Sequence, residues 1–424
     1  MKTLSPLAQN YIDRFDSALE TLPGAGDRNI STLRKSGLEK FSKLDFPNKR
    51  IEEWRFTNLA SLTKGAANED QPTTPALAHD AFKADYEVVF ENGVFSKEKS
   101  HLDNLPEGVR ITSLAEELGG GAVFSLDEDD NRALIALNTA YMQDGLCLHV
   151  GDGVEVPGVL AVRFLTKTDE PQNIHIRNRI TLGDGAKLTL LEEHEGNGHY
   201  FVNPVTMIHL SDGATLNHYK HQNESLAAYH IALTDCELAS NATYRNFALT
   251  HGARLSRNEM KTSILGANAL SKLDGAYLLD GNQHCDTTSL TEHKVSQNVS
   301  EQVYKGVLTG KSHGVFQGKI HIFPDAQQVS GDQLSKALLL SDNAQVDCKP
   351  ELEIYADDVK CSHGATTGEL DEDALFYLQA RGIPTDQAKK MLVEAFLGDV
   401  LLEIENDAIR QYFEALSASW LERV

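Results

Sequence analysis

A short phrase that recurs at intervals of roughly thirty residues constrains the fold of this chain more than any other feature of its sequence. The phrase appears as VGDGVEV, LGDGAKLTL and LSDGATLNHY, with turn glycines at Gly153, Gly185 and Gly213. Two later segments continue the repeat at a similar spacing but with less regular turn sequences: LGANALSKLDGAYLL and LTGKSHGVFQGKIHIF. A repeat of this length predicts stacked supersecondary units, in which each unit buries its apolar face against its neighbours.

The segments between these turns have the pattern of short strands. KLTLLEE and TYRNFAL alternate polar and apolar residues, which predicts one buried face and one face in water. No helical pattern between them is long enough to form a crossover, so a Rossmann-type fold or an α/β barrel is excluded. A β-solenoid and a β-sandwich both remain, and the unequal length of the repeats favours the solenoid.

The regions on either side of this strand-rich segment have a different sequence pattern, which suggests three domains. Residues 1–128 are predicted to be mostly helical, with a hairpin at YEVVFENGVFS whose turn residues are Asn92 and Gly93. Residues 129–368 are predicted to form the solenoid core. Residues 369–424 return to a helical pattern, so the fold class is mainly β with helical domains at both ends.

The C-terminal helical region contains a short helix ended by Gly382 and a second helix for which Thr385 is the expected N-cap. One side of this second helix is apolar, and its residues are Ala388, Met391, Leu392, Ala395 and Phe396. Such a pair of amphipathic helices caps the last coil of a solenoid or docks a partner protein. The sequence leaves both roles open.

Composition excludes several classes of function. Lys and Arg total 39 against 62 Asp and Glu, a formal net charge of −23, which argues against binding nucleic acid or an anionic membrane. The chain shows neither a signal peptide nor an apolar run of membrane-spanning length, so a soluble, cytoplasmic protein is expected. Its five cysteines form no C-x-x-C pair, which suggests reduced thiols and no closed structural zinc site.

The segment DDVKCSHGATTG places Cys361 two residues before His363 at the end of the strand-rich region. Residues at positions i and i+2 of a strand point to the same side, so a sulfur and an imidazole would lie next to each other. Zinc and iron-sulfur clusters need more ligands than these two, which would have to come from elsewhere in the fold, a second chain or sulfide. Ordinary packing of both residues is the alternative, and nothing nearby resembles the oxyanion loop that a Cys-His nucleophile pair requires.

The remaining histidines are too dispersed along the sequence to define a site. His175, His218 and His221 lie in strand-like segments, and we expect them on wet or half-buried strand faces. The segment GVLTGKS superficially resembles a phosphate-binding loop, but it has one residue too few between its glycines and does not precede a helix. ATP binding by this chain is therefore not expected.

Three long segments resemble the SufB/SufD family of iron-sulfur assembly scaffolds in the SUF system. They are PNKRIEEWRFTNL, ALNTAYMQDGLCLHVGDGVEVPG and the stretch from VYKGVLTGKSHG through DDVKCSHGATTGELDEDALFYLQARGI. The modest length and the helical N-terminal region are more similar to the SufD branch than to the SufB branch. The resemblance covers most of the chain, and its C-terminal block is the most specific part.

The resemblance implies a right-handed parallel β-helix and a non-catalytic scaffold role. It also implies pairing with a SufB-like subunit and binding of a SufC-like ABC ATPase. His363, with Cys361 nearby, matches a family position at the interface with SufB that is implicated in nascent cluster assembly. A transient cluster shared with that subunit is implied, with no permanently bound cofactor, and Met391, Leu392, Ala395 and Phe396 become candidate residues for ATPase docking.

Three other interpretations follow from the same sequence. The chain could be the sibling subunit SufB, a carbohydrate-active β-helix enzyme, or a purely structural β-helix without chemistry. The isolated chain is also expected to form homodimers through the strand surface that a SufB-like subunit would cover. A strict monomer in light scattering would exclude that homodimer.

Overall fold

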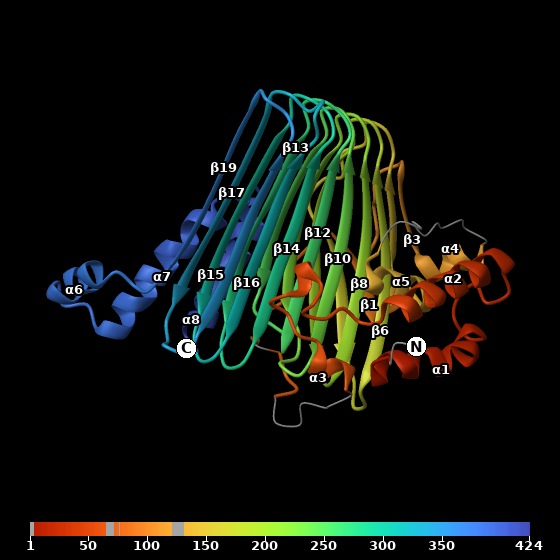
Figure 1. Ribbon diagram of the computed structural model, residues 1–424, viewed down its shortest axis with the longest axis horizontal. Coiled ribbons are helices and arrows are strands. Elements are labelled where there is room, and N and C mark those ends of the chain that lie inside the picture. The colour runs from red at the N-terminus through yellow and green to blue at the C-terminus, as the bar shows by residue number, and fades with distance from the viewer. Residues whose placement is uncertain (1–3, 65–71, 76, 121–130) are drawn as a thin grey trace.

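The computed structural model describes the chain except for residues 1–3, 65–71, 76 and 121–130. Its centre is a β-solenoid in which, from Leu146 onward, the chain alternates between two sheets that lie against each other (Figure 1). The ten-stranded sheet contains β1 (Tyr86–Glu91), β2 (Val94–Phe95), β5 (Leu160–Lys167), β7 (Lys187–Asn197), β9 (Thr215–Asn223), β11 (Thr243–Thr250), β13 (Leu270–Leu279), β15 (Val299–Leu308), β17 (Val329–Leu339) and β19 (Val359–Gly368). The nine-stranded sheet contains β3 (Val109–Ser113), β4 (Leu146–Val150), β6 (Gln172–Leu182), β8 (Tyr200–Leu210), β10 (Tyr229–Leu238), β12 (Leu255–Ile264), β14 (His284–His293), β16 (His313–Ile322) and β18 (Gln345–Ile354). The solenoid strands pair in parallel, and the pairs β1–β2 and β3–β4 are antiparallel. The predicted mainly β solenoid with helical flanks is confirmed.

The turns that carry the recurring GDG phrase stack on one another along one edge of the solenoid, and we call this stack a column of turns. Gly153, Gly185 and Gly213 have φ of 69°, 64° and 69°, the left-handed conformation that glycine adopts without steric cost. The backbone N–H of each turn donates to the next turn, as from Gly185 to the Asp212 carbonyl at 2.8 Å. Asparagine and glutamine take over the same left-handed position in the later coils, at Asn241, Asn268, Gln297 and Gln328. The structural repeat therefore continues in coils whose sequences lack the GDG motif.

One predicted member of the repeat belongs to a different column. Gly310 of LTGKSHG lies between β15 and β16, at the opposite edge of the solenoid from the GDG turns. It follows Gly281 in that second column, and the N–H of Lys311 donates to the Gly281 carbonyl at 2.7 Å. Each coil has two turns of similar composition, and sequence alone did not distinguish them.

Nine helical segments flank the solenoid within the described residues. They are α1 (Pro6–Leu19), α2 (Arg28–Leu44), the 3₁₀ turn η1 (Glu52–Trp54), α3 (Ala60–Thr63), α4 (Leu114–Gly119), α5 (Ala133–Tyr141), α6 (Glu372–Ala380), α7 (Thr385–Leu401) and α8 (Asp407–Leu421). Helices α1, α2, α4 and α5 lie toward the end of the solenoid where its coils begin, and α6 projects away from the body at the opposite end (Figure 1). The segment with η1 instead crosses the nine-stranded sheet as far as β18, where Lys349 contacts Glu52 at 2.8 Å. No helix in the described ranges is long and apolar enough to cross a membrane.

Both outer faces of the solenoid are covered over much of their area. Tyr11, Phe41 and Phe46 of the N-terminal region pack on the nine-stranded sheet, in one cluster with Phe201 and Ile231. The C-terminal helices pack on the ten-stranded sheet through Val393, Leu397, Val400, Ile409, Phe413 and Trp420. The prediction of one wet face for KLTLLEE and TYRNFAL is therefore wrong, because α7 and α8 bury the outward side of these strands.

The segment EEWRFT attaches the N-terminal region to the solenoid wall. The guanidinium of Arg257 on β12 lies 4.1 Å from the centre of the Trp54 ring, a cation–π contact. The Thr57 hydroxyl donates to Asp286 on β14 and lies 2.8 Å from Nε2 of His284. Trp54, Thr57 and Arg257 are all buried, so these contacts fix the approach of the chain to the sheet.

The predicted hairpin forms between β1 and β2, and both Asn92 and Gly93 have positive φ. Thr385 was expected to cap α7, but it is the first residue of that helix, and its hydroxyl accepts from Gln379 at 3.0 Å. The predicted boundary between residues 128 and 129 lies outside the described residues. The strands β1 and β3, which precede it, pair with solenoid strands.

Candidate functional site at the open end of the solenoid

The solenoid ends at β18 and β19, and within the described residues each of these strands has a hydrogen-bonded neighbour strand on one side only. The other side presents a row of backbone donors and acceptors, the arrangement through which strands of another chain add to a sheet. Cys361 and His363 lie on β19 at this end, on the side of the strand that faces the solenoid interior. The structure therefore places both predicted residues at the same open edge.

Cys361 is half-buried and packs against the apolar end of the last coils, including Ile320, Ile322 and Val329. Burial raises the pKa of the Cys361 thiol; the backbone N–H of Gly331 lowers it and the carboxylate of Asp332 raises it further. Since the thiolate is the form that binds metals, a partner or metal must overcome this cost before the sulfur can act as a ligand.

His363 is exposed and lies in register with Gln333 on the preceding coil. The Gln333 side chain is 2% exposed, yet neither its amide nitrogen nor its amide oxygen has a hydrogen-bond partner among the described residues. A buried amide without hydrogen-bond partners is costly, so a group from a partner chain that bonds to Gln333 would be favoured next to His363. Sequence reasoning missed Gln333, although the thirty-residue offset from His363 was a signal that could have found it.

Two clusters among the described residues bring at least three potential metal-ligand atoms together, and neither contains Cys361 or His363. At the open end the described part of the chain therefore supplies these two side chains without a third ligand from His, Cys, Asp or Glu. The role of Cys361 and His363 in cluster assembly remains a prediction.

The predicted apolar stripe of α7 is divided between two surroundings. Ala388, Val393 and Leu397 form the buried side of the helix, which faces the ten-stranded sheet. Met391 is 41% exposed and Ala395 is also exposed, whereas Leu392 and Phe396 are half-buried. Phe396 lies under the Nζ atom of Lys305, 4.8 Å from the ring centre, and its carbonyl accepts from Lys305 at 2.5 Å. Ala388 is buried and Phe396 contacts the solenoid, whereas Met391, Leu392 and Ala395 remain at least partly accessible.

The helix α6 presents two aromatic residues to solvent. Phe376 is 71% exposed and Tyr377 is 58% exposed, and α6 has no buried residue of its own. Exposed aromatic side chains on a projecting helix are characteristic of binding surfaces. Sequence reasoning did not select them because the apolar residues of this short helix follow one another without a clear helical stripe.

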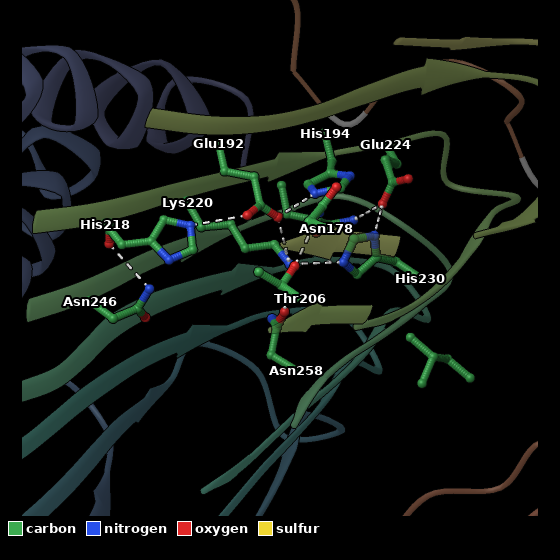
Figure 2. A network of polar contacts seen from close by, with 12 residues as sticks. Asn178, Glu192, His194, Thr206, His218, Lys220, Glu224, His230, Asn246 and Asn258 are labelled. Carbon is green, nitrogen blue, oxygen red and sulfur yellow. Dashed lines mark hydrogen bonds and ion pairs between the residues drawn. The ribbon is translucent and has the colours of Figure 1, made fainter. Parts of the chain in front are cut away.

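The interior of the solenoid contains a polar network that the sequence did not predict (Figure 2). Figure 2 shows side chains from several successive coils converging between the two sheets, with Glu192, His194, His218, Lys220 and His230 among them. All of these residues are buried. The expectation of wet or half-buried faces is wrong for His175, His218 and His221, which are 2%, 2% and 0% exposed.

Lys220 supplies the positive charge of this interior network. Its Nζ atom lies 3.6 Å from Glu192 and 3.1 Å from Nε2 of His230, whose Nδ1 atom lies 2.7 Å from Glu224. Burial by itself would raise the pKa of both carboxyl groups. The pKa of Glu192 is nevertheless held well below its usual value, chiefly by Lys220 and His194. The pKa of Glu224 is lowered to about 2, chiefly by His230. His194, Glu224 and His230 also offer ligand atoms within 4.8 Å of one another, but the neighbouring ammonium group disfavours a second cation there.

Comparison with known proteins identifies the family. Residues 164–396 match the family described as "SUF system FeS cluster assembly, SufBD core domain", and residues 5–162 match the "SufBD protein N-terminal region". The two matches together cover the solenoid, the open end with Cys361 and His363, and most of the N-terminal region.

Curated relatives agree with this assignment. An iron-sulfur cluster assembly SufBD family protein of Synechocystis is 29% identical, and the match covers 93% of each chain. The iron-sulfur cluster assembly protein SufD of Escherichia coli is 27% identical over 88% of this chain and 89% of its own length. The chloroplastic protein ABCI7 of Arabidopsis thaliana is 27% identical over 96% of this chain and 89% of its own. The chain therefore belongs to the SufBD family of the SUF iron-sulfur cluster assembly system.

Proposed function

We propose that this chain is a non-catalytic, cytoplasmic scaffold subunit that pairs with a SufB-like subunit and holds a SufC-like ATPase. The observation that carries the proposal is the open end of the solenoid, where two unpaired strand edges lie next to Cys361 and His363. A sibling solenoid could add its own edge strands there and bring further ligands. The nascent cluster is then cargo assembled between two chains, which accounts for an incomplete ligand set on one of them.

The proposed role assigns different tasks to the two exposed surfaces. The open end receives the sibling subunit, and the projecting helices α6 and α7 receive the ATPase through Phe376, Tyr377, Met391, Leu392 and Ala395. ATP hydrolysis is assigned to the partner. The family match leaves the carbohydrate-active interpretation without support.

Replacing His363 with Ala should lower the yield of assembled cluster at least about tenfold, since even the outer partners of a metal ligand are worth that much. His363 is exposed at the edge of the last strand, so the fold and the subunit complex should survive. The measurement is labile iron and sulfide in the anaerobically purified complex of the co-expressed SUF subunits.

The matched control is His209→Ala, because His209 is also exposed on a strand but lies far from the open end in sequence and sheet order. An unchanged cluster yield in His363→Ala would remove this residue from the mechanism. Loss of the sibling subunit from the purified complex would instead assign His363 to subunit pairing.

Replacing Met391 and Ala395 with Asp should weaken ATPase binding by about thirtyfold or more, since truncation of a central interface residue costs about 2 kcal/mol. Both side chains are exposed, so the solenoid should remain folded. Binding is measured by calorimetry between the two purified proteins. Leu402→Asp is the control, because Leu402 is 68% exposed immediately after α7 but outside the proposed surface. Equal affinity of the double variant and the control would place the docking site elsewhere.

A further inference from the structure

A second cluster of potential metal ligands lies on the outer side of the ten-stranded sheet. It combines His79, from the segment before β1, with Glu195 on β7 and His221 on β9. One ligand atom from each of the three residues lies within 4.8 Å of the others. The three residues come from different parts of the chain, so the cluster exists only because the N-terminal segment folds against the solenoid.

His79 directs an unpaired nitrogen toward Glu195. Its Nδ1 atom lies 2.9 Å from the carbonyl oxygen of Asp80, which can only accept, so Nδ1 carries the proton. The Nε2 atom of neutral His79 is then an acceptor, and it lies 3.3 Å from Oε1 of Glu195, outside hydrogen-bond geometry. Two acceptors that face each other in this way require a cation or a proton between them.

His221 also has a buried nitrogen for which the described part of the chain offers no hydrogen-bond partner. The residue is fully buried, and its Nδ1 atom is unpaired, with Oε1 of Glu193 at 3.7 Å. Its Nε2 atom lies 3.1 Å from Nε2 of His251, an arrangement in which one imidazole donates to the other. When His221 donates, its Nδ1 lone pair is available as a ligand and His251 serves as the outer partner that orients it.

The charges around this cluster favour a cation. The charge of Arg163 also acts on Glu195, but two carboxylates, Glu193 and Glu87, are ion-paired with that guanidinium. The one ion pair that Glu195 makes among the described residues is with His79. The interior network differs because it contains Lys220. Glu195 is 28% exposed at its side chain and also lines an open cavity of about 260 Å³, so solvent reaches this one carboxylate of the cluster.

We propose that His79, Glu195 and His221 bind one divalent first-row transition metal ion. Two imidazoles and one carboxylate are a ligand set typical of zinc and of non-haem iron(II), with further positions left for water. The Asp80 carbonyl and the hydroxyl of Tyr412, which lies 3.2 Å from Nδ1 of His79, would hold that imidazole in place. The ion would fasten the segment before β1 to the solenoid and to α8. This site is separate from the scaffold role, so either proposal can fail without the other.

The test uses the untagged full-length chain after treatment with a chelator and desalting. Co²⁺ is titrated and followed by visible absorption, and Zn²⁺ is titrated in competition with a chromophoric chelator. We expect one equivalent of each ion to bind, with a rise in melting temperature. His79→Gln and Glu195→Gln should each weaken binding by at least about 100-fold, more than the loss of an outer partner costs. Glutamine keeps a polar side chain of similar length at both positions, and circular dichroism checks the fold.

One matched variant makes the assignment specific. His209→Gln changes an exposed histidine that lies 3.3 Å from Glu237 and outside both proposed sites. It should bind one equivalent with unchanged affinity. Absence of binding to the unaltered chain would mean that His79 is an imidazolium paired with Glu195, and the proposal would be overturned. Equal affinity in His79→Gln, Glu195→Gln and the unaltered chain would overturn it as well.

Discussion

Replacing Lys220 with Met should lower the free energy of unfolding by about 3–5 kcal/mol, the usual cost of removing one partner from a buried ion pair. The ammonium group of Lys220 lies between the buried carboxylate of Glu192 and the imidazole of His230, and no solvent is available to replace it. Urea denaturation followed by circular dichroism measures the loss. The exposed pair of Lys187 and Glu155 supplies the control, because Lys187→Met should cost less than about 1 kcal/mol.

A second variant separates charge from packing at the same position. In Lys220→Met combined with Glu192→Gln, one buried negative charge is removed together with its partner, so part of the stability should return. A double variant as unstable as the sum of the two single variants would show that Lys220 and Glu192 do not interact. If Lys220→Met costs as little stability as Lys187→Met, the side chain of Lys220 is not a charged partner of Glu192 in the folded protein.

The fold should lose stability steeply as the pH falls from about 6.5 toward 4. Burial lowers the pKa values of His175, His230, His284 and His293 to about 4. Between these values and the ordinary value near 6.5 the unfolded chain binds protons that the folded chain does not. Stability from these groups is therefore complete above pH 6.5 and is lost on acidification.

One buried acid acts in the opposite direction. Burial raises the pKa of Asp274 to about 8, with Lys272 opposing the shift, so protonation of this carboxyl favours the folded state as the pH falls. These four histidines and Asp274 together contribute a slope of about 4 kcal/mol per pH unit at its steepest. Burial also lowers the pKa values of His221 and His251, which act in the same direction as the four histidines. Since domains are stable by only about 5–15 kcal/mol, cooperative unfolding is expected before pH 4.

Urea midpoints at pH 7.5, 6.0 and 5.0 test this slope. His293→Gln should reduce the slope by about 1.4 kcal/mol per pH unit, because it removes one group whose folded and unfolded pKa values differ. The exposed His209 provides the control, and His209→Gln should leave the slope unchanged. Midpoints that do not move between pH 7.5 and 5.0 would show that the buried histidines bind protons in the folded state.

Local features of the sequence favoured the solenoid over a β-sandwich. The turn residues Gly153, Gly185 and Gly213 require a left-handed backbone that few other residues adopt, so their spacing reports directly on the coil length. The alternation of strand residues and the Asn92–Gly93 turn are equally local. Cys361 and His363 were placed on one strand face by the same two-residue period.

Only the tertiary structure decided what surrounds each strand face. On β9, His218 faces the interior together with Lys220, and His221, three positions later, faces the outer side that the C-terminal helices cover. The sequence pattern of a strand gives two faces but not what covers them, because the covering helices lie almost two hundred residues away. His79 reaches Glu195 for the same reason, through contacts between distant segments that have no signature in local periodicity.

The sequence of this protein thus determined the solenoid, its turns and the pair of residues at its open end, because backbone conformation and side-chain alternation are set by near neighbours. The buried charge network, the division of α7 between a packed and an accessible side, and the cluster of His79, Glu195 and His221 were decided by the packing of remote segments. Burial and opposing charges act through space, and they can be assigned only when the neighbours of each side chain are known.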